Sequence, residues 1–173
     1  MVLKWLKILL LLVVIWGGSV AAGYWVIRQD VAIAGVAVRI PHPVESPEVG
    51  QVLDAWRGVP VRHNGHPSWR SVGRHSAVSG YYYGKQWQCV EYIKRFYYDA
   101  FGHEMPDVMG HARSFFNPAV PHGSLNPQRG LLQFANGQDV PPQIDDLIVW
   151  QYDTYGHVAI VTRVEESYIE VIQ

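Results

Sequence analysis

The feature that most constrains the fold is a helical pattern that begins at the only cysteine, Cys89. Apolar residues recur three and four positions apart, at Ile93, Phe96, Tyr97 and Ala100. Charged residues occupy the intervening positions: Glu91, Lys94, Arg95 and Asp99. The spacing predicts an amphipathic helix that exposes its charged side and ends at Gly102. Cys89 would then open the helix, where free N–H groups and the helix dipole favour a thiolate.

The C-terminal part of the sequence predicts a sheet with a histidine at the start of one strand. Residues 144–151 have the pattern of a buried strand, residues 157–164 that of a second and residues 168–173 that of a third. His157 begins the second strand, and Gln173 lies near the end of the third. We therefore predict an α+β fold in which a helix carrying the thiol packs on an antiparallel sheet carrying the imidazole, a papain-like arrangement.

The rest of the chain is organised more simply. We predict residues 30–57 as a connector, with a short strand within 31–40 and one or two helical turns within 49–56. The compact domain would cover residues 58–173. Inside it we predict a short helix within 108–116 and a loop over 121–142.

The N-terminal segment determines the predicted compartment. Lys4 and Lys7 precede an uncharged run over residues 8–27, which is long enough to span a bilayer as a helix. Small residues at 17–22 also fit a cleavable signal. We favour an uncleaved membrane anchor over residues 1–29, with secretion as the alternative. Either case places the domain outside the cytoplasm, because the lysines stay on the cytoplasmic side.

Charge and histidine spacing exclude several classes of function. Lys and Arg total 14 against 15 for Asp and Glu, so no strong field exists to hold nucleic acid. The 8 histidines are scattered and form no zinc-binding helix motif, so we predict no metal and no cofactor. The oligomeric state is left open.

Two segments, residues 85–91 and 156–161, carry the predicted chemistry. The thiol of Cys89 would be the nucleophile and His157 its base, since such pairs are distant in sequence and joined by the fold. A buried structural thiol is the alternative. The Cys89 N–H and the Gln88 side chain are candidate oxyanion donors. Trp87 and Trp150 would pack beside the site, in the core or as walls of a substrate groove.

These segments, with Leu132-Gln133, Asn136-Gly137, residues 146–150 and Thr162, resemble the CHAP family of cysteine- and histidine-dependent amidohydrolases/peptidases. More specifically, these residues resemble the amidase domain of glutathionylspermidine synthetase/amidase. It implies that Cys89 is the nucleophile and His157 the base, oriented by a Glu, Asn or Asp on the next strand.

Gln173 stands where the family has that third residue. A glutamine can accept the ring N–H and hold the tautomer, but it does not stabilise imidazolium as a carboxylate does. The sequence stops within a predicted strand, so two alternatives stay open: Gln173 is the third residue, or a continuation of the chain supplies another.

The first functional hypothesis is an extracytoplasmic thiol amidohydrolase or peptidase that cleaves cell-wall (peptidoglycan) peptide through an acyl-enzyme. The second is hydrolysis of a glutathione–polyamine amide, as the narrower resemblance implies. The third is a non-catalytic module that binds wall peptide in the same cleft.

Overall fold

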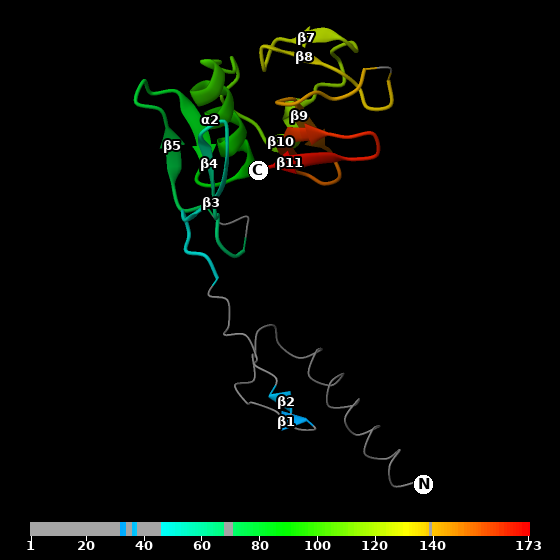
Figure 1. Cartoon of the computed structure of the whole chain (residues 1–173). Coiled ribbons are helices and arrows are strands. Elements are labelled where there is room, and N and C mark those ends of the chain that lie inside the picture. The colour runs from blue at the N-terminus through cyan, green and yellow to red at the C-terminus, as the bar shows by residue number, and fades with distance from the viewer. Residues whose placement is uncertain (1–31, 34–35, 38–45, 68–70, 139) are drawn as a thin grey trace. The chain divides into compact units, whose positions relative to one another are not determined.

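A computed structural model describes residues 32–33, 36–37, 46–67, 71–138 and 140–173 (Figure 1). The chain divides into two compact units, Met1–Ser46 and Pro47–Gln173. In the first, β1 (Ala32–Ile33) and β2 (Val36–Ala37) form an antiparallel pair. The predicted anchor or signal segment, residues 1–29, lies outside the described residues. Among the residues that are described, no helix combines the length and apolar character needed to cross a membrane.

The second unit is an α+β domain rich in short strands. Its strands before the helix are β3 (Val52–Trp56), β4 (Val59–Arg62), β5 (Arg74–Ser76) and β6 (Tyr82–Lys85). Then come the helix α2 (Cys89–Phe101) and the 3-10 helix η1 (Ala112–Phe115). The remaining strands are β7 (Ser124–Asn126), β8 (Leu131–Gln133), β9 (Leu147–Trp150), β10 (His157–Val164) and β11 (Ile169–Ile172).

The helix after Cys89 forms as its apolar spacing predicts, and Gly102 ends it in the left-handed conformation. Ile93 and Phe96 are fully buried, and α2 contacts β4, β6 and β10. Asp99 is exposed as predicted, but the prediction was wrong for the other three charged residues of that side. Glu91 and Lys94 are 0% exposed and Arg95 is 5% exposed, because β5, β6 and the loop after Gly102 cover that side.

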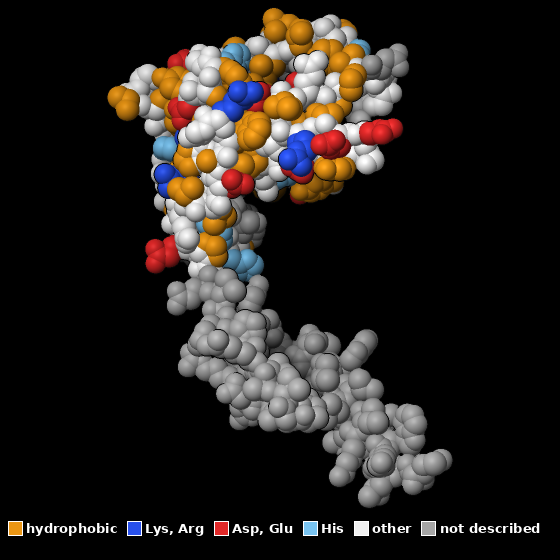
Figure 2. Space-filling view, in the orientation of Figure 1, with side chains coloured by type: hydrophobic (Ala, Val, Ile, Leu, Met, Phe, Trp, Pro, Cys, Tyr) orange, Lys and Arg blue, Asp and Glu red, His pale blue; other side chains and the backbone are white. Residues whose placement is uncertain are grey.

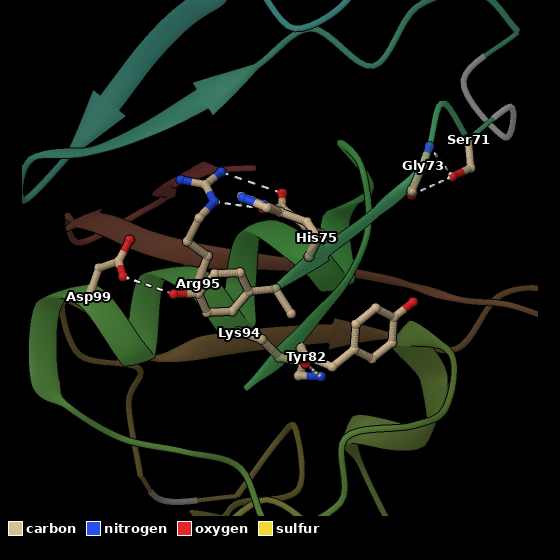
Figure 3. A network of polar contacts seen from close by, with 9 residues as sticks. Ser71, Gly73, His75, Tyr82, Lys94, Arg95 and Asp99 are labelled. Carbon is tan, nitrogen blue, oxygen red and sulfur yellow. Dashed lines mark hydrogen bonds and ion pairs between the residues drawn. The ribbon is translucent and has the colours of Figure 1, made fainter. Parts of the chain in front are cut away.

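Paired contacts make this burial of charge tolerable, since a buried charge is costly unless it is paired and hydrogen-bonded. Glu91 accepts a hydrogen bond from Arg95 Nε at 2.6 Å and lies 2.7 Å from His75 Nδ1 (Figure 3). Lys94 donates to the carbonyls of Tyr82 and of Val108, the latter at 2.9 Å. Burial, together with the nearby charge of Arg129, lowers the pKa of Lys94 to about 8.

The C-terminal sheet has the order β11-β10-β9 and is antiparallel throughout. His157 pairs with Trp150 and Ile160 pairs with Leu147. Val158 and Ile160 belong to the core cluster that includes α2 residues, so this side of β10 faces the helix. The strand predicted over 157–164 has these bounds, and the other two predicted strands form at 147–150 and 169–172.

The helical turns predicted within 49–56 were wrong, because this segment forms β3 and pairs with β4. Arg57 and Gly58 connect the strands with φ values of 47° and 81°, the positive pair that a tight hairpin turn requires. Arg57 and Trp56 also bind the Asp145 carboxylate, at 2.6 to 2.8 Å. The compact unit therefore extends upstream of the predicted boundary at residue 58.

Two other segments differ in detail from the sequence predictions. The helix predicted within 108–116 is limited to η1, and the predicted loop 121–142 contains the β7–β8 hairpin. Buried Gln133 on β8 accepts a bond from the Asn117 N–H at 2.8 Å and binds Asn126 at 3.0 Å. The hairpin is held by these amide contacts rather than by an alternating apolar pattern, and such a pattern is what predicts a strand from sequence.

On the face in Figure 2, charges of both signs are interspersed among the described residues.

Replacing Glu91 by glutamine should lower the free energy of unfolding by about 3 kcal/mol, because Arg95 would keep a buried charge without its counterion. Chemical denaturation of the variant measures this. Glu165→Gln is the matched control, since the exposed pair between Glu165 and Arg163 at 4.0 Å should contribute at most about 0.5 kcal/mol. Equal effects of both variants would contradict the structural role of the buried pair.

Candidate active site

Cys89 is the first residue of α2, and its partly buried thiol lies at the N-terminal end of the helix. Gln88 is the N-cap, with extended backbone at φ −75° and ψ 158°. Gly84 of β6 lies directly against this turn, since a Cβ there would come within 3.1 Å of the Glu91 backbone. The close contact between β6 and α2 thus positions the first turn that carries the thiol.

Opposing effects act on the pKa of the Cys89 thiol. Burial, the largest effect, raises the pKa, while hydrogen bonds from the backbone of Val90, Val158 and Cys89 itself lower it. The net direction is upward, so the structure does not favour a resting thiolate in the way that helix position alone predicts. The Val158 bond matters in a second way, because it connects the sulfur to the residue next to His157.

His157 begins β10 and is half-buried. Gly156 precedes it at φ 68°, where a Cβ would meet the Trp150 carbonyl at 2.4 Å, so this turn into the strand requires glycine. The rings of His157 and Trp150 lie 5.6 Å apart, tilted by 32°. Burial lowers the pKa of His157, and the charge of Asp153 opposes this effect without reversing it. The lowered pKa favours a neutral imidazole at pH 7.

Gln173 follows β11 and is exposed. The register pairs Ile160 with Ile172, so continuing it by one residue sets Gln173 opposite Ala159. Side chains alternate along a strand, and Ala159 shares its face with His157. An extension of this register would therefore set Gln173 diagonal to His157.

A pocket connects the thiol with the β3–β4 hairpin. Its lining consists of Leu53, residues 61–64, Trp87, Cys89 and Gln173. Two residues predicted at the site, Trp87 and Gln173, therefore share one pocket with the nucleophile candidate.

The two remaining site candidates, His157 and Trp150, lie on the C-terminal sheet. His157 and Trp150 do not line this pocket, and among residues 46–67, 71–138 and 140–173 no direct hydrogen bond joins His157 to Cys89. Cys89 instead packs against the core cluster that contains Val158, the residue after His157. The same residues contain no cluster of three or more His, Cys, Asp or Glu side chains arranged to hold a metal ion.

Sequence analysis missed the contribution of residues 61–64, because it assigned them to the compact domain without predicting an element or a role for them. A signal was present, since Arg57-Gly58 between two apolar runs fits a hairpin turn. It also missed His75, whose Nδ1 lies 2.7 Å from the carboxylate of Glu91, two residues after Cys89. A strand histidine gives no local indication that its partner is a helix carboxylate.

Comparison with known proteins identifies relatives of this domain. Residues 79–173 match the family model described as CHAP domain. A trypanothione synthetase of Crithidia fasciculata is 27% identical over 114 residues, which is 64% of this chain and 17% of that protein. The bifunctional glutathionylspermidine synthetase/amidase of Escherichia coli (strain K12) is 30% identical over 103 residues, 57% of this chain and 16% of that protein. The chain thus matches only a small part of these relatives' length.

Iodoacetamide alkylation of Cys89 should rise with pH to a midpoint above the ordinary thiol value of about 8.5, because burial raises its pKa. His157→Ala should slow labelling near pH 7, where a neutral imidazole can accept the proton, and should leave the rate unchanged once the thiolate forms by itself. Stopped-flow or mass-spectrometric labelling rates measure both effects. A midpoint below about pH 7 would instead demonstrate a preformed thiolate.

Proposed function

Because the chain belongs to the CHAP domain family, we propose that it is a hydrolase of amide or peptide bonds that uses Cys89 as nucleophile and His157 as base. The observation that carries the proposal is the packing of Cys89 against the core cluster that contains Val158, which brings the helix start beside the strand that begins at His157. This is the papain-like arrangement that we propose for residues 58–173.

The proposed reaction begins from a neutral thiol and a neutral imidazole. Burial raises the pKa of Cys89 and lowers that of His157, so the proton would transfer to the ring as the sulfur attacks the carbonyl. The attack forms a C–S bond, and the amine leaves after protonation by the imidazolium. Water activated by His157 then hydrolyses the acyl-enzyme and restores the thiol.

The remaining predicted residues have supporting roles in this proposal. The backbone N–H of Cys89 and the side chain of Gln88, the N-cap, would stabilise the oxyanion. Gln173 would hold the imidazole tautomer from the neighbouring strand position. Trp87 would form a wall of the substrate pocket, and Trp150 would support the His157 ring.

We further propose that the domain acts outside the cytoplasm, attached through residues 1–29, and that its substrate is cell-wall (peptidoglycan) peptide. The sequence pattern of Lys4, Lys7 and the uncharged run to residue 27 supports the location. Residues 30–46 would connect the segment to the compact unit that begins at Pro47. An exported amidohydrolase meets wall peptide there as an abundant amide substrate.

Incubation of the full chain with soluble wall peptides should release new amino groups, detected by mass spectrometry. Cys89→Ala should abolish release, and His157→Ala should reduce kcat/KM by about 10²- to 10⁴-fold, the usual contribution of a general base. Gln138→Ala, at an exposed position of the β8–β9 connection, is the control and should retain activity. Hydrolysis that survives Cys89→Ala would refute the thiol mechanism.

A second candidate substrate rests on one of the relatives. The name of the Escherichia coli protein includes a glutathionylspermidine amidase, and this chain is 30% identical to it over 103 residues. Hydrolysis of glutathionylspermidine in preference to wall peptides would favour that substrate. Failure to cleave either, with an unreactive thiol, would favour a module that only binds wall peptide.

Gln173→Glu tests the proposed third residue. A carboxylate diagonal to His157 should stabilise imidazolium and raise its pKa by about 1 unit, so the acid limb of the kcat/KM profile should move to higher pH by that amount. Gln138→Glu introduces the same charge at an exposed position of the β8–β9 connection and should leave the limb in place. An unchanged acid limb in Gln173→Glu would remove Gln173 from the site.

A further inference from the structure

We propose that Arg62 forms a carboxylate-binding subsite beside Cys89, so that the preferred substrates carry a free carboxylate close to the scissile amide. The inference deepens the proposed function and rests on it. It comes from the β3–β4 hairpin, which lies before the residues 79–173 that match the family. The hairpin contributes residues 61–64 to the pocket that also contains the thiol.

The guanidinium of Arg62 is oriented before any ligand arrives. Its Nη1 donates to the Gly50 carbonyl at 2.8 Å, and its central carbon, Cζ, lies 5.1 Å from the centre of the Trp87 ring. Trp87 lies two residues before Cys89 and lines the same pocket. One hydrogen bond and one stacking contact thus fix a planar group with five donors, most of which stay available for a ligand.

Within the described part of the chain, no carboxylate neutralises the charge of this guanidinium. No ion pair among the described residues involves Arg62, whereas the other pocket side chains are apolar, amide, imidazole, indole or thiol. The described lining therefore contains a cation and no carboxylate. A partly buried arginine in such a setting binds an anion well, since water screens its charge less than on the open surface.

A carboxylate is the anion that matches both the geometry and the proposed reaction. The arginine fork pairs with the two oxygens of a carboxylate through parallel hydrogen bonds. Because Arg62 and Cys89 line one pocket, that group would belong to the residue adjacent to the scissile bond. It would be either a chain-terminal carboxylate or an acidic side chain. Leu53 and Val61 offer apolar contact to the rest of that residue.

The subsite can be tested on the thiol without any hydrolysis. The full chain is alkylated with iodoacetate and with iodoacetamide, which differ by a carboxylate in place of an amide, at one pH and low ionic strength. Arg62→Gln should slow iodoacetate about fivefold or more while changing the iodoacetamide rate less than about twofold, because only the anion uses the guanidinium. Arg163→Gln, an exposed arginine on β10, should change neither rate.

Wild-type protein supplies a second measurement that needs no folded variant. A capped dipeptide with a free C-terminus should protect Cys89 from iodoacetamide, and its C-terminal amide should not. A capped dipeptide amide with an aspartate side chain tests the other source of the carboxylate. Protection by either acid supports the subsite and identifies its source.

Two results would overturn the subsite. The first is an equal loss of both alkylation rates in Arg62→Gln, which would make Arg62 a general support of the thiol. The second is an unchanged iodoacetate rate in that variant together with no protection of the wild type by either acid. Both measurements are independent of hydrolysis. An inactive protein would therefore refute the proposed function, whereas the alkylation and protection rates alone would decide whether the carboxylate subsite exists.

Discussion

The buried contacts of Glu91 position the start of α2, and the candidate site depends on that position. Glu91 lies in the first turn, two residues after Cys89, and binds Arg95 on the same helix and His75 on β5. Gly84 allows β6 to approach the same turn. On the opposite side, Val158 and Ile160 of β10 complete the core around the helix. The thiol therefore lies where the N-terminal strands and the C-terminal sheet meet, and its sulfur reaches the Val158 peptide.

The β3–β4 hairpin connects the two parts of the domain through a different set of contacts. Arg57 and Trp56 bind the Asp145 carboxylate, which lies just before β9, and Tyr97 of α2 donates to the Asp145 carbonyl at 2.9 Å. These bonds fix the hairpin against the helix and the sheet together. Residues 61–64 at its far end consequently have a defined place beside Cys89. The segment upstream of the family match thus completes the pocket of the domain.

Sequence patterns predicted those parts of this structure in which local periodicity and burial agree. The helix from Cys89 to Phe101, its stop at Gly102 and the strand from His157 to Val164 have the predicted bounds, and the CHAP resemblance is confirmed. Periodicity failed where charged residues are buried. Glu91, Lys94 and Arg95 have the spacing of a solvated face, but their partners come from β5, β6 and the loop at Val108. Such long-range pairing leaves no trace in a window of neighbouring residues.

A glutamine at the proposed third position would be chemically consistent with the other proposed site residues. A carboxylate there would stabilise imidazolium and so favour a resting ion pair with the thiolate. In this protein burial raises the pKa of Cys89 and lowers that of His157, so both groups favour their neutral forms. A neutral amide can orient a neutral ring without opposing either shift. In the proposed mechanism the pair would separate charge only as a substrate carbonyl accepts the sulfur, and the cation of Arg62 in the same pocket would favour a substrate that carries a carboxylate.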